Sequence, residues 1–433
     1  MIAPRTVEQV REVMLFASAS GGLIARGAGR SYGDAAQNDG GAVLDLASIS
    51  NMELLEGPLL RVGAGARLSA ALRALAAVGL TLPVLPGTRH ITVGGAIAAD
   101  IHGKNHRRDG SFGHHVENLL LCTPDGELRR LSRLEQPDLF HATLGGMGLT
   151  GVIVEAILRP SRLTGPLLHG DIDRASSIEQ TLSVMRQDAA HRYSIAWVDL
   201  ISRGSAFGRS VVLRCNDRDN APDTMAPGRI ALPGRPRLSV PERFPPAVLR
   251  PATVRAFNAL RFHRAPAHAR AQPITLAENF FPLDALAHWN RLYGPAGLLQ
   301  YQFVVPDDRA HILVEVVEGL RRARQPMYLA VIKRFGEPSG GLMSFPMPGW
   351  TLAVDLPAGS PGLRQSLRAA DELLAGSGGR VYLAKDARLG ADLLGAMYPA
   401  LERFKAIRFT VDPEGTLRSD MARRLDLAAG ATA

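Results

Sequence analysis

The sequence has 433 residues, a length that predicts two domains rather than one hydrophobic core. Hydrophobic residues make up 46% and charged residues 21%, which is the balance of a globular protein. The two cysteines, Cys122 and Cys215, exclude a disulfide framework and a cysteine-based zinc site. We expect no membrane-spanning helix, because no apolar run reaches about 18 residues.

The formal net charge of +9 allows two interpretations. It indicates either an anionic partner, such as nucleic acid, a membrane surface or a phosphorylated substrate, or only an arginine-rich composition. The basic residues are scattered and form no zinc-finger, RNA-recognition or basic-helix motif, so we expect no nucleic-acid partner. Residues 1–11 lack the apolar stretch of a signal peptide. We therefore expect a cytoplasmic protein, or one that lies peripherally at the inner face of the membrane.

The chain up to Pro160 alternates short strands with helices. Helices are predicted over residues 4–19 and 68–78, and a third begins near Thr92, where a glycine pair opens an alanine-rich stretch. Gly79 stands where a helix C-cap glycine is expected. Extended segments are predicted over residues 22–25, 42–46, 59–62, 80–85, 116–121, 126–131 and 149–159.

Beyond Pro160 the pattern predicts a second α+β unit. Its strands are predicted over residues 299–305, 327–334 and 350–356, and its helices over 310–322 and 362–374. Residues 216–270 are rich in proline and arginine, and we expect mobile loops there with one helix over 251–261. Residues 405–427 are charged and helical, with Pro413 as an interruption.

Two glycine-rich segments are candidates for a dinucleotide site. Residues 25–34 contain three glycines within seven residues, which allows a turn whose N–H groups could hold a pyrophosphate. The spacing is not that of a Rossmann fingerprint. A second glycine turn, over residues 86–97, follows about 60 residues later. Either segment alone could be an ordinary structural turn, but the pair favours a dinucleotide held between them.

Two further segments bring reactive side chains into apolar surroundings. His102 and His106 are four residues apart, which could suit a metal, but Gly103 and Asn105 disfavour a helix and no third ligand is evident. The alternatives are a structural histidine, or a polar loop that places His102 and Lys104 near a reacting group. Lys385 ends an otherwise apolar strand, where a buried ammonium needs a partner, unless the segment is simply a surface strand end.

Together these motifs resemble one family, the decaprenylphosphoryl-β-D-ribose 2′-oxidases. These are vanillyl-alcohol-oxidase-like flavoproteins with a PCMH-type FAD-binding domain. The resemblance covers nearly the whole chain except residues 216–270. It rests on residues 25–34, 85–88, 92–95, 100–106 and 148–151, and on 289–290, 293–297, 299–303, 344–346, 348–350, 384–386, 397–399 and 419–424.

The resemblance implies a two-domain α+β fold with a discontinuous FAD domain. Residues 1–163 would form its first part and residues 380–433 would complete it. Residues 164–379 would form a substrate domain built on an antiparallel sheet. The FAD-binding residues that the resemblance implies are Ala25, Arg26, Gly27, Ala28, Gly29, Arg30, Ser31, Tyr32, Gly33, Asp34, Ala35, Gly87, Thr92, Val93, Gly94, Gly95, Ala99, Asp100, Ile101, His102, Ile153 and Tyr382.

The resemblance also implies the reaction. It is oxidation of the ribose 2′-hydroxyl of polyprenylphosphoryl-β-D-ribofuranose to a 2′-keto sugar, which an NAD(P)H-dependent short-chain reductase then converts to the arabinose epimer. Lys385, Tyr32 and His102 are the catalytic candidates, and the sequence leaves open whether Lys385 or Tyr32 is the base. The expected substrate-side residues are Lys104, Trp197, Gln300, Gln302, Lys333, Ala353 and Lys385.

Two positions depart from the mycobacterial members of the family. Ala353 stands where they carry Cys, so a thiol-directed inhibitor should not attach there, and Thr351 stands where they carry Asn. Two other functions remain open at this point. One is an O₂-using oxidase of the alditol or aldonolactone type, and the other is a non-catalytic flavin-binding partner in a glycan-assembly complex.

We predict that the FAD is dissociable. Relatives with a covalently attached flavin carry His immediately before the serine of the first glycine loop, and this chain has Arg30 there. A guanidinium cannot form that bond. Acid precipitation of the purified protein should therefore leave the flavin in the supernatant, as measured by its visible absorbance. Flavin that stays in the washed pellet would contradict the prediction.

Overall fold

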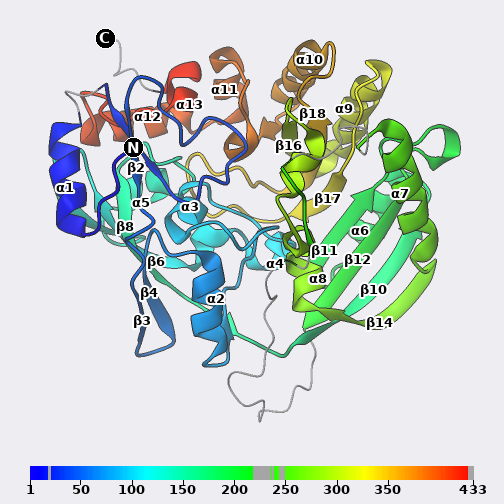
Figure 1. The fold of residues 1–433 in the computed structure, drawn as a ribbon, viewed down its shortest axis with the longest axis horizontal. Coiled ribbons are helices and arrows are strands. Elements are labelled where there is room, and N and C mark those ends of the chain that lie inside the picture. The colour runs from blue at the N-terminus through cyan, green and yellow to red at the C-terminus, as the bar shows by residue number, and fades with distance from the viewer. Residues whose placement is uncertain (18–20, 218–235, 237, 243–248, 428–433) are drawn as a thin grey trace.

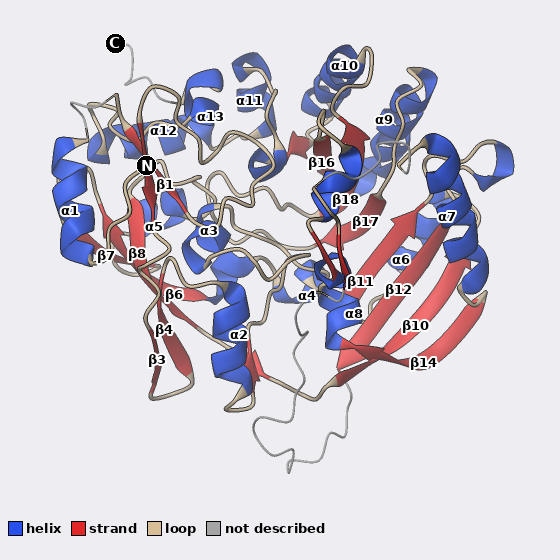
Figure 2. Ribbon diagram, viewed as in Figure 1, coloured by secondary structure: helices blue, strands red, loops and turns tan. Residues whose placement is uncertain are grey.

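The computed structural model describes residues 1–17, 21–217, 236, 238–242 and 249–427. Two large antiparallel sheets stand beside each other and helices cover them (Figure 1 and Figure 2). One sheet has five strands and the other has eight. Among the described residues, none of the helices has the length and apolar content needed to cross a bilayer.

The five-stranded sheet has the order β3-β4-β8-β6-β7. Its central strand, β8, is almost entirely buried because sheet neighbours flank it and α3 packs on it. The strands are β3 (Met52–Leu55), β4 (Leu59–Gly63), β6 (Val116–Cys122), β7 (Leu128–Ser132) and β8 (Val152–Leu158). The nearby helices are α1 (Val7–Phe16), α2 (Leu68–Ala76), α3 (Val93–Ala98), α4 (His106–Asp109) and α5 (Pro137–Thr143).

Shorter strand pairs connect this sheet to its surroundings. Strand β1 (Leu23–Arg26) leads into the first glycine loop, and β2 (Ala42–Asp45) follows it. The two strands pair in parallel. The other pairs are β5 (Leu80–Thr81) with β9 (Ser161–Arg162), and β13 (Leu238–Ser239) with β15 (Leu286–Ala287).

The eight-stranded sheet has the order β14-β10-β12-β11-β17-β18-β16-β19. Its strands are β10 (Leu167–Ala175), β11 (Tyr193–Val198), β12 (Ser210–Asp217), β14 (His268–Thr275), β16 (Leu298–Pro306), β17 (Ala330–Phe335), β18 (Gly349–Pro357) and β19 (Arg380–Val381). Helices α6 (Ile178–Arg186), α9 (Ala310–Arg322) and α10 (Leu363–Gly376) pack against it. Their apolar stripes bury the alternate residues of the strands, such as Val212 between Val211 and Leu213.

The last helices return to the beginning of the chain, so that red and blue segments lie together in Figure 1. These helices are α11 (Ala391–Met397), α12 (Leu401–Val411) and α13 (Asp420–Arg424). Leu417 forms a bridge with Leu23, and the buried Arg408 donates to the carbonyl oxygens of Leu149 and Leu417. The C-terminal segment is therefore part of the packing around the first glycine loop.

Most of the predicted elements are confirmed, and one region was predicted wrongly. The helix over 310–322 is α9 with the same bounds, and the helix expected from Pro251 is α7 (Pro251–Arg264). Strands β10, β11 and β12 were missed. The loop prediction fails at the end of residues 216–270, where β14 begins at His268. In β10 and β14 the alternation of apolar and polar residues is hidden by Asp171, Asp173, His268 and Arg270. These side chains form ion pairs between the two strands. Residues 218–235, 237 and 243–248 of the expected loops lie outside the described residues.

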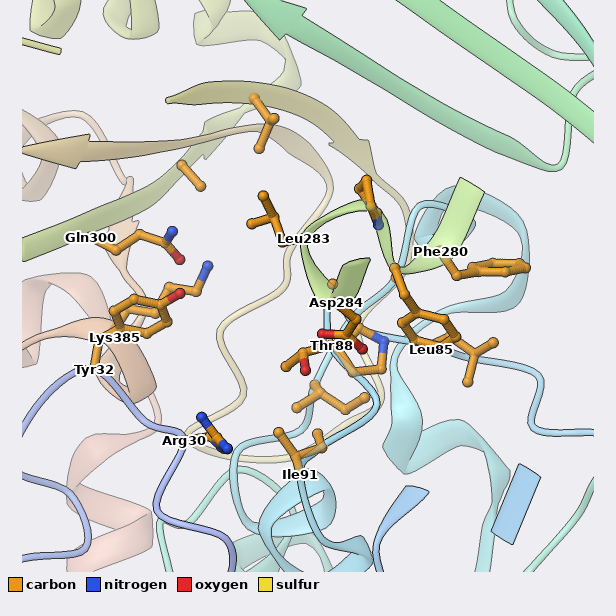
Figure 3. Close-up of a pocket in the computed structure, with 18 of the residues that line it drawn as sticks. Arg30, Tyr32, Leu85, Thr88, Ile91, Phe280, Leu283, Asp284, Gln300 and Lys385 are labelled. Carbon is orange, nitrogen blue, oxygen red and sulfur yellow. The ribbon is translucent and has the colours of Figure 1, made fainter. Parts of the chain in front are cut away.

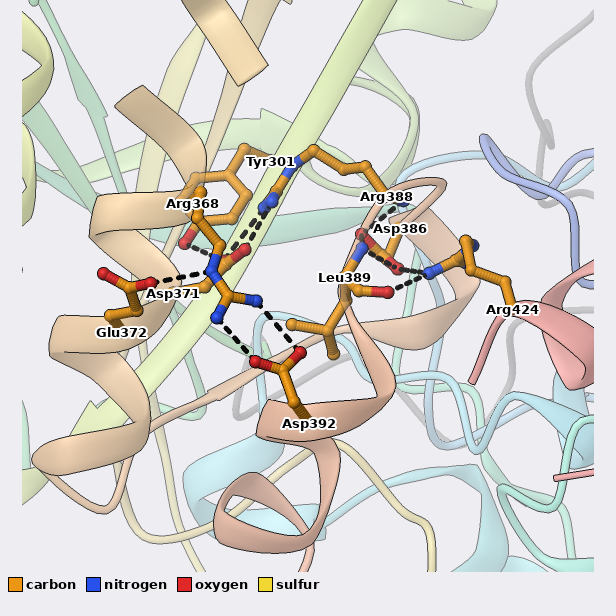
Figure 4. Close-up of polar contacts among 9 residues, drawn as sticks. All are labelled: Tyr301, Arg368, Asp371, Glu372, Asp386, Arg388, Leu389, Asp392 and Arg424. Carbon is orange, nitrogen blue, oxygen red and sulfur yellow. Dashed lines mark hydrogen bonds and ion pairs between the residues drawn. The ribbon is translucent and has the colours of Figure 1, made fainter. Parts of the chain in front are cut away.

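One arginine connects three distant parts of the chain. Arg424 of α13 donates two hydrogen bonds to the carboxylate of Asp34 in the first glycine loop, at 2.9 and 2.8 Å. It also donates to Asp386 at 2.9 Å and to the carbonyl oxygen of Leu389 at 2.7 Å (Figure 4). Asp386 is buried and directly follows Lys385. The guanidinium of Arg424 therefore holds the first glycine loop and the segment after Lys385 next to each other.

We predict that Arg424→Ala lowers the free energy of unfolding by about 2–4 kcal/mol. The estimate is below that for a fully buried pair, because the side chains of Arg424 and Asp34 are 21% and 18% exposed. Arg368→Ala is the matched control, since Arg368 makes a similar two-pronged pair with Asp392 at the surface (Figure 4). Urea denaturation should show a large shift for Arg424→Ala and almost none for Arg368→Ala. Equal midpoints for the two variants would contradict the prediction.

Candidate active site

A cavity of about 1920 Å³ lies between the glycine loops and the eight-stranded sheet. It is larger than the roughly 300–1,000 Å³ typical of a single small-ligand site, so a dinucleotide and a second ligand both fit. Figure 3 shows Arg30, Tyr32 and Lys385 on one side and Leu85, Phe280 and Asp284 on the other, with Leu283 projecting between them.

One wall of the cavity is built from small residues that let the backbone approach a ligand. Gly29 has a positive φ of 59°, which an L side chain rarely adopts. A Cβ at Gly94 would lie 2.8 Å from the Cβ of Ala64, so only glycine allows this packing of α3 against β4. At Gly87 a Cβ would meet nothing within 4 Å, because this glycine borders the open cavity. This cradle fits a pyrophosphate-containing cofactor such as FAD.

Most of the residues that the sequence predicted for FAD line this cavity. They are Ala25, Gly27, Ala28, Gly29, Arg30, Ser31, Tyr32, Ala35, Gly87, Thr92, Gly94, Gly95, Ala99, Ile101, His102, Ile153 and Tyr382. Five predicted residues lie outside the lining: Arg26, Gly33, Asp34, Val93 and Asp100. Asp34 lies behind it in its pair with Arg424, and Arg26 lines a smaller neighbouring cavity.

Asp100 has a supporting position in the core. Its backbone has a φ of 36°, and its fully buried carboxylate accepts hydrogen bonds from the hydroxyls of Ser111, Ser339 and Ser344 at 2.6–2.8 Å. It also accepts from the amide of Gly113 at 2.8 Å. These contacts use the carboxylate, so Asp100 orients the segment that carries His102 while its side chain points away from the cavity lining.

The sequence contains only four lysines, and three of them, Lys104, Lys333 and Lys385, line this one cavity. Burial lowers the pKa of Lys104 and of Lys385 to about 8. Burial and the charges of the other two lysines hold the pKa of Lys333 well below its usual value. The ε-amino group of Lys104 donates to the carbonyl oxygen of Asn279. Three partly buried amines in one cavity favour an anionic or hydroxyl-rich ligand.

Lys385 lies within a polar group that the fold places at the end of β18. Its Nζ atom is 5.8 Å from the centre of the Tyr32 ring, and the amide of Tyr32 donates to the carbonyl oxygen of Ala384. The buried carboxylate of Asp355 accepts from Gln300 at 2.6 Å and from the hydroxyl of Tyr293 at 2.9 Å. Its negative charge opposes the burial that lowers the pKa of Lys385. Burial raises the pKa of Tyr32, so this phenol stays protonated.

His102 is held neutral beside the lysines. Its pKa lies well below the usual value because it is buried and close to Lys333 and Lys385. Its Nε2 atom accepts from the side-chain amide of Gln302 at 3.0 Å, which places the proton on Nδ1. Nδ1 has no hydrogen-bond partner among the described residues. His106 is separate, since its Nδ1 accepts from the amide of Gly336 at 3.1 Å and burial lowers its pKa to about 3.

Six of the seven expected substrate-side residues line the cavity, namely Lys104, Trp197, Gln300, Lys333, Ala353 and Lys385. Gln302 is fully buried behind them, where it donates to His102 and to Thr351. The sequence analysis missed Asp355 and Tyr293. A carboxylate within the apolar run 350–356 was the available signal for Asp355, because such a group needs hydrogen-bond donors when it is buried.

Comparison with known proteins agrees with this geometry. Residues 1–132 match the model of the FAD binding domain, and residues 357–425 match that of D-arabinono-1,4-lactone oxidase. Decaprenylphosphoryl-beta-D-ribose oxidase of Mycolicibacterium smegmatis is 38% identical over 96% of this chain and 92% of its own length. An uncharacterized protein of Streptomyces coelicolor is 38% identical over 81% of this chain and 97% of its own. Alditol oxidase of a Streptomyces strain is 25% identical over 98% of this chain and 94% of its own.

These matches confirm the resemblance that the motifs indicated. The match to the mycobacterial protein extends over both sheets and the C-terminal helices, and the FAD binding domain covers the glycine-lined wall. The chain is thus an FAD-binding oxidoreductase and belongs to the decaprenylphosphoryl-β-D-ribose oxidase family.

Proposed function

We propose that this chain oxidises the ribose 2′-hydroxyl of a polyprenylphosphoryl-β-D-ribofuranose to the 2′-keto sugar. The observation that supports it most directly is the placement of the Lys385 amine beside Tyr32 and the glycine-lined wall, in a cavity with room for a second ligand. The relative that matches nearly the whole chain is named for the same sugar lipid. The 2′ position and the keto product are our inference.

Lys385 is the better candidate for the base. An amine with a pKa of about 8 is partly neutral near physiological pH and can accept the hydroxyl proton. Tyr32 has a raised pKa, so it would act as a hydrogen-bond donor that orients the sugar. The unpaired Nδ1–H of His102 is a second donor at the same wall. Bound FAD supplies the two-electron acceptor for the oxidation, and the glycine loops and Tyr382 would hold it.

The product suggests a partner and a location. A 2′-keto sugar needs a hydride donor to become the arabinose epimer, so we propose that an NAD(P)H-dependent short-chain reductase acts next. A polyprenyl substrate resides in a membrane, which favours peripheral contact at the inner face. For the domains, we propose that residues 1–163 and 380–433 form the cofactor unit and residues 164–379 the substrate unit.

A second candidate function is oxidation of a free polyol with O₂ as the acceptor. The near full-length match to alditol oxidase favours it, although the identity is only 25%. The apolar lining over the eight-stranded sheet favours the lipid-linked sugar instead. Rapid reoxidation of the reduced protein by O₂, together with bleaching of the flavin by free polyols, would favour the polyol oxidase.

We predict that Lys385→Ala yields a folded, yellow protein whose rate of flavin reduction by polyprenylphosphoryl ribose is about 10²–10⁴-fold lower, the usual contribution of a general base. Anaerobic stopped-flow absorbance measures this rate. Lys405→Ala is the control, because Lys405 lies on α12 and pairs with Glu402 outside the cavity. Near-wild-type reduction in Lys385→Ala would remove this amine from the mechanism.

We also predict that kcat/KM rises as the pH increases through about 8. The amine of Lys385 is protonated below that pH and becomes able to accept a proton above it. Asp355→Asn should move this rise to lower pH, because the carboxylate of Asp355 raises the pKa of Lys385. The asparagine keeps one acceptor oxygen for Gln300, and its amide nitrogen can donate to the hydroxyl oxygen of Tyr293. A pH profile that does not move in Asp355→Asn would show that another group controls the rise.

A further inference from the structure

The cavity extends beyond the polar group around Lys385 onto an aliphatic face of the eight-stranded sheet. Helices α6, α9 and α10 pack against the sheet. The residues of β10, β11 and β12 that line the cavity are Ile172, Ile195, Trp197, Val211 and Leu213. Strand pairing sets Ile172 opposite Leu213, and Leu213 opposite Ile195. These side chains are only partly buried, so the sheet presents an apolar floor that the described part of the chain does not cover fully.

The floor continues without a break to the reactive end of the cavity. Val211 pairs with Trp197, Trp197 with Val331, and Val331 with Ala353. Strands are about 4.8 Å apart, so the floor extends roughly 19 Å from β18 to β10. We refer to the floor over β10, β11, β12 and β17, with the helix α7 that borders it, as the apolar groove.

One face of α7 borders the apolar groove. Phe257, Leu260, Arg261 and Arg264 are spaced at i, i+3, i+4 and i+7, and all four line the cavity. Phe257 and Leu260 are 60% and 53% exposed, which is unusual for large apolar side chains that face an apolar floor. The opposite face of α7 is fixed, because the buried Asn258 donates to the carboxylate of Asp199 at 2.9 Å.

Arg261 is an exposed arginine that has no anionic partner among the described residues. Its guanidinium lies 5.2 Å from the centre of the Trp197 ring, and no described residue accepts a hydrogen bond or forms an ion pair with it. The charge of Arg261 contributes to the low pKa of Lys104, so the two cations lie near each other. The carboxylates in the lining are already engaged, since Glu278 accepts from Thr275 and Asp284 pairs with Arg89.

We propose that Arg261, with Lys104, binds the phosphate of a prenyl-phosphate ligand whose isoprenoid chain lies in the apolar groove. A guanidinium matches phosphate geometry and can donate two hydrogen bonds to it. The adjacent floor and the exposed Phe257 and Leu260 match the hydrocarbon chain. The inference rests on the proposed function, because it assigns the phosphate and the chain of that substrate, but it concerns binding alone.

The test uses the flavin-loaded protein and radiolabelled farnesyl phosphate in equilibrium dialysis. Arg261→Ala should weaken binding about 10- to 100-fold, the range expected for a lost hydrogen bond to a charged group. Arg261→Lys should recover part of the affinity. Arg255→Ala is the matched control, because Arg255 belongs to the same helix but lies outside the cavity lining, and it should bind like the wild type. Equal affinity of Arg261→Ala and Arg255→Ala would overturn the proposal.

Competition experiments separate the phosphate from the chain. Farnesol and inorganic phosphate should each displace the label much more weakly than farnesyl phosphate. Inorganic phosphate that competes as well as farnesyl phosphate would overturn the assignment of the groove. Affinity should increase from geranyl to farnesyl phosphate, and Leu213→Gln should reduce that increase, because it places a polar side chain on the floor. Circular dichroism and flavin content establish that each variant is folded.

The same preparations separate this inference from the proposed reaction. Flavin reduction by polyprenylphosphoryl ribose, with no effect of Arg261→Ala on farnesyl phosphate binding, would overturn the phosphate site and leave the reaction intact. Arg261-dependent binding of farnesyl phosphate without any flavin reduction would support the phosphate site and count against the reaction.

Discussion

The structure depends on the ion pairs of Arg424 with Asp34 and Asp386. One guanidinium holds the first glycine loop, the loop that follows Lys385, and the C-terminal helix α13 in fixed positions. The wall that would hold the flavin and the amine that would act on the sugar are therefore not independent. Redox chemistry between two bound molecules needs alignment to within about 1 Å, and a guanidinium shared by these two loops provides such alignment.

The two kinds of cation in this protein have different tasks. Arginines such as Arg388, Arg408 and Arg424 are fixed by buried hydrogen bonds and hold the backbone. Of the few lysines, three lie in the cavity. A guanidinium stays charged in almost any environment, whereas an ammonium loses its proton when it is buried, so only lysine can serve as a base here. The positive charge of the chain is therefore carried almost entirely by arginine, since 46 of its 50 Lys and Arg residues are arginines.

The sequence predicted the local parts of the site and missed those that depend on long-range pairing. The glycine loops and Lys385 stand out because a glycine cluster or a lysine in an apolar run is unusual by itself. Asp355 meets Tyr293 only through the fold, and Arg261 reaches Trp197 only after β11 and α7 have packed. Asp100 shows the same limit, since the contacts of its carboxylate with three serines behind the cavity depend on residues far apart in the sequence.

The eight-stranded sheet gives the cavity a fixed length scale. Ala353 lies at one end of the cross-strand row, and Trp197, whose ring contacts Arg261 of α7, lies two strands away through the pairs Ala353 with Val331 and Val331 with Trp197. Strand pairing sets the distance between the backbones of Ala353 and Trp197 at about 10 Å. The row of paired residues therefore sets the length of the floor, while the Arg261 side chain, which comes from α7, sets where an anionic group would lie above it.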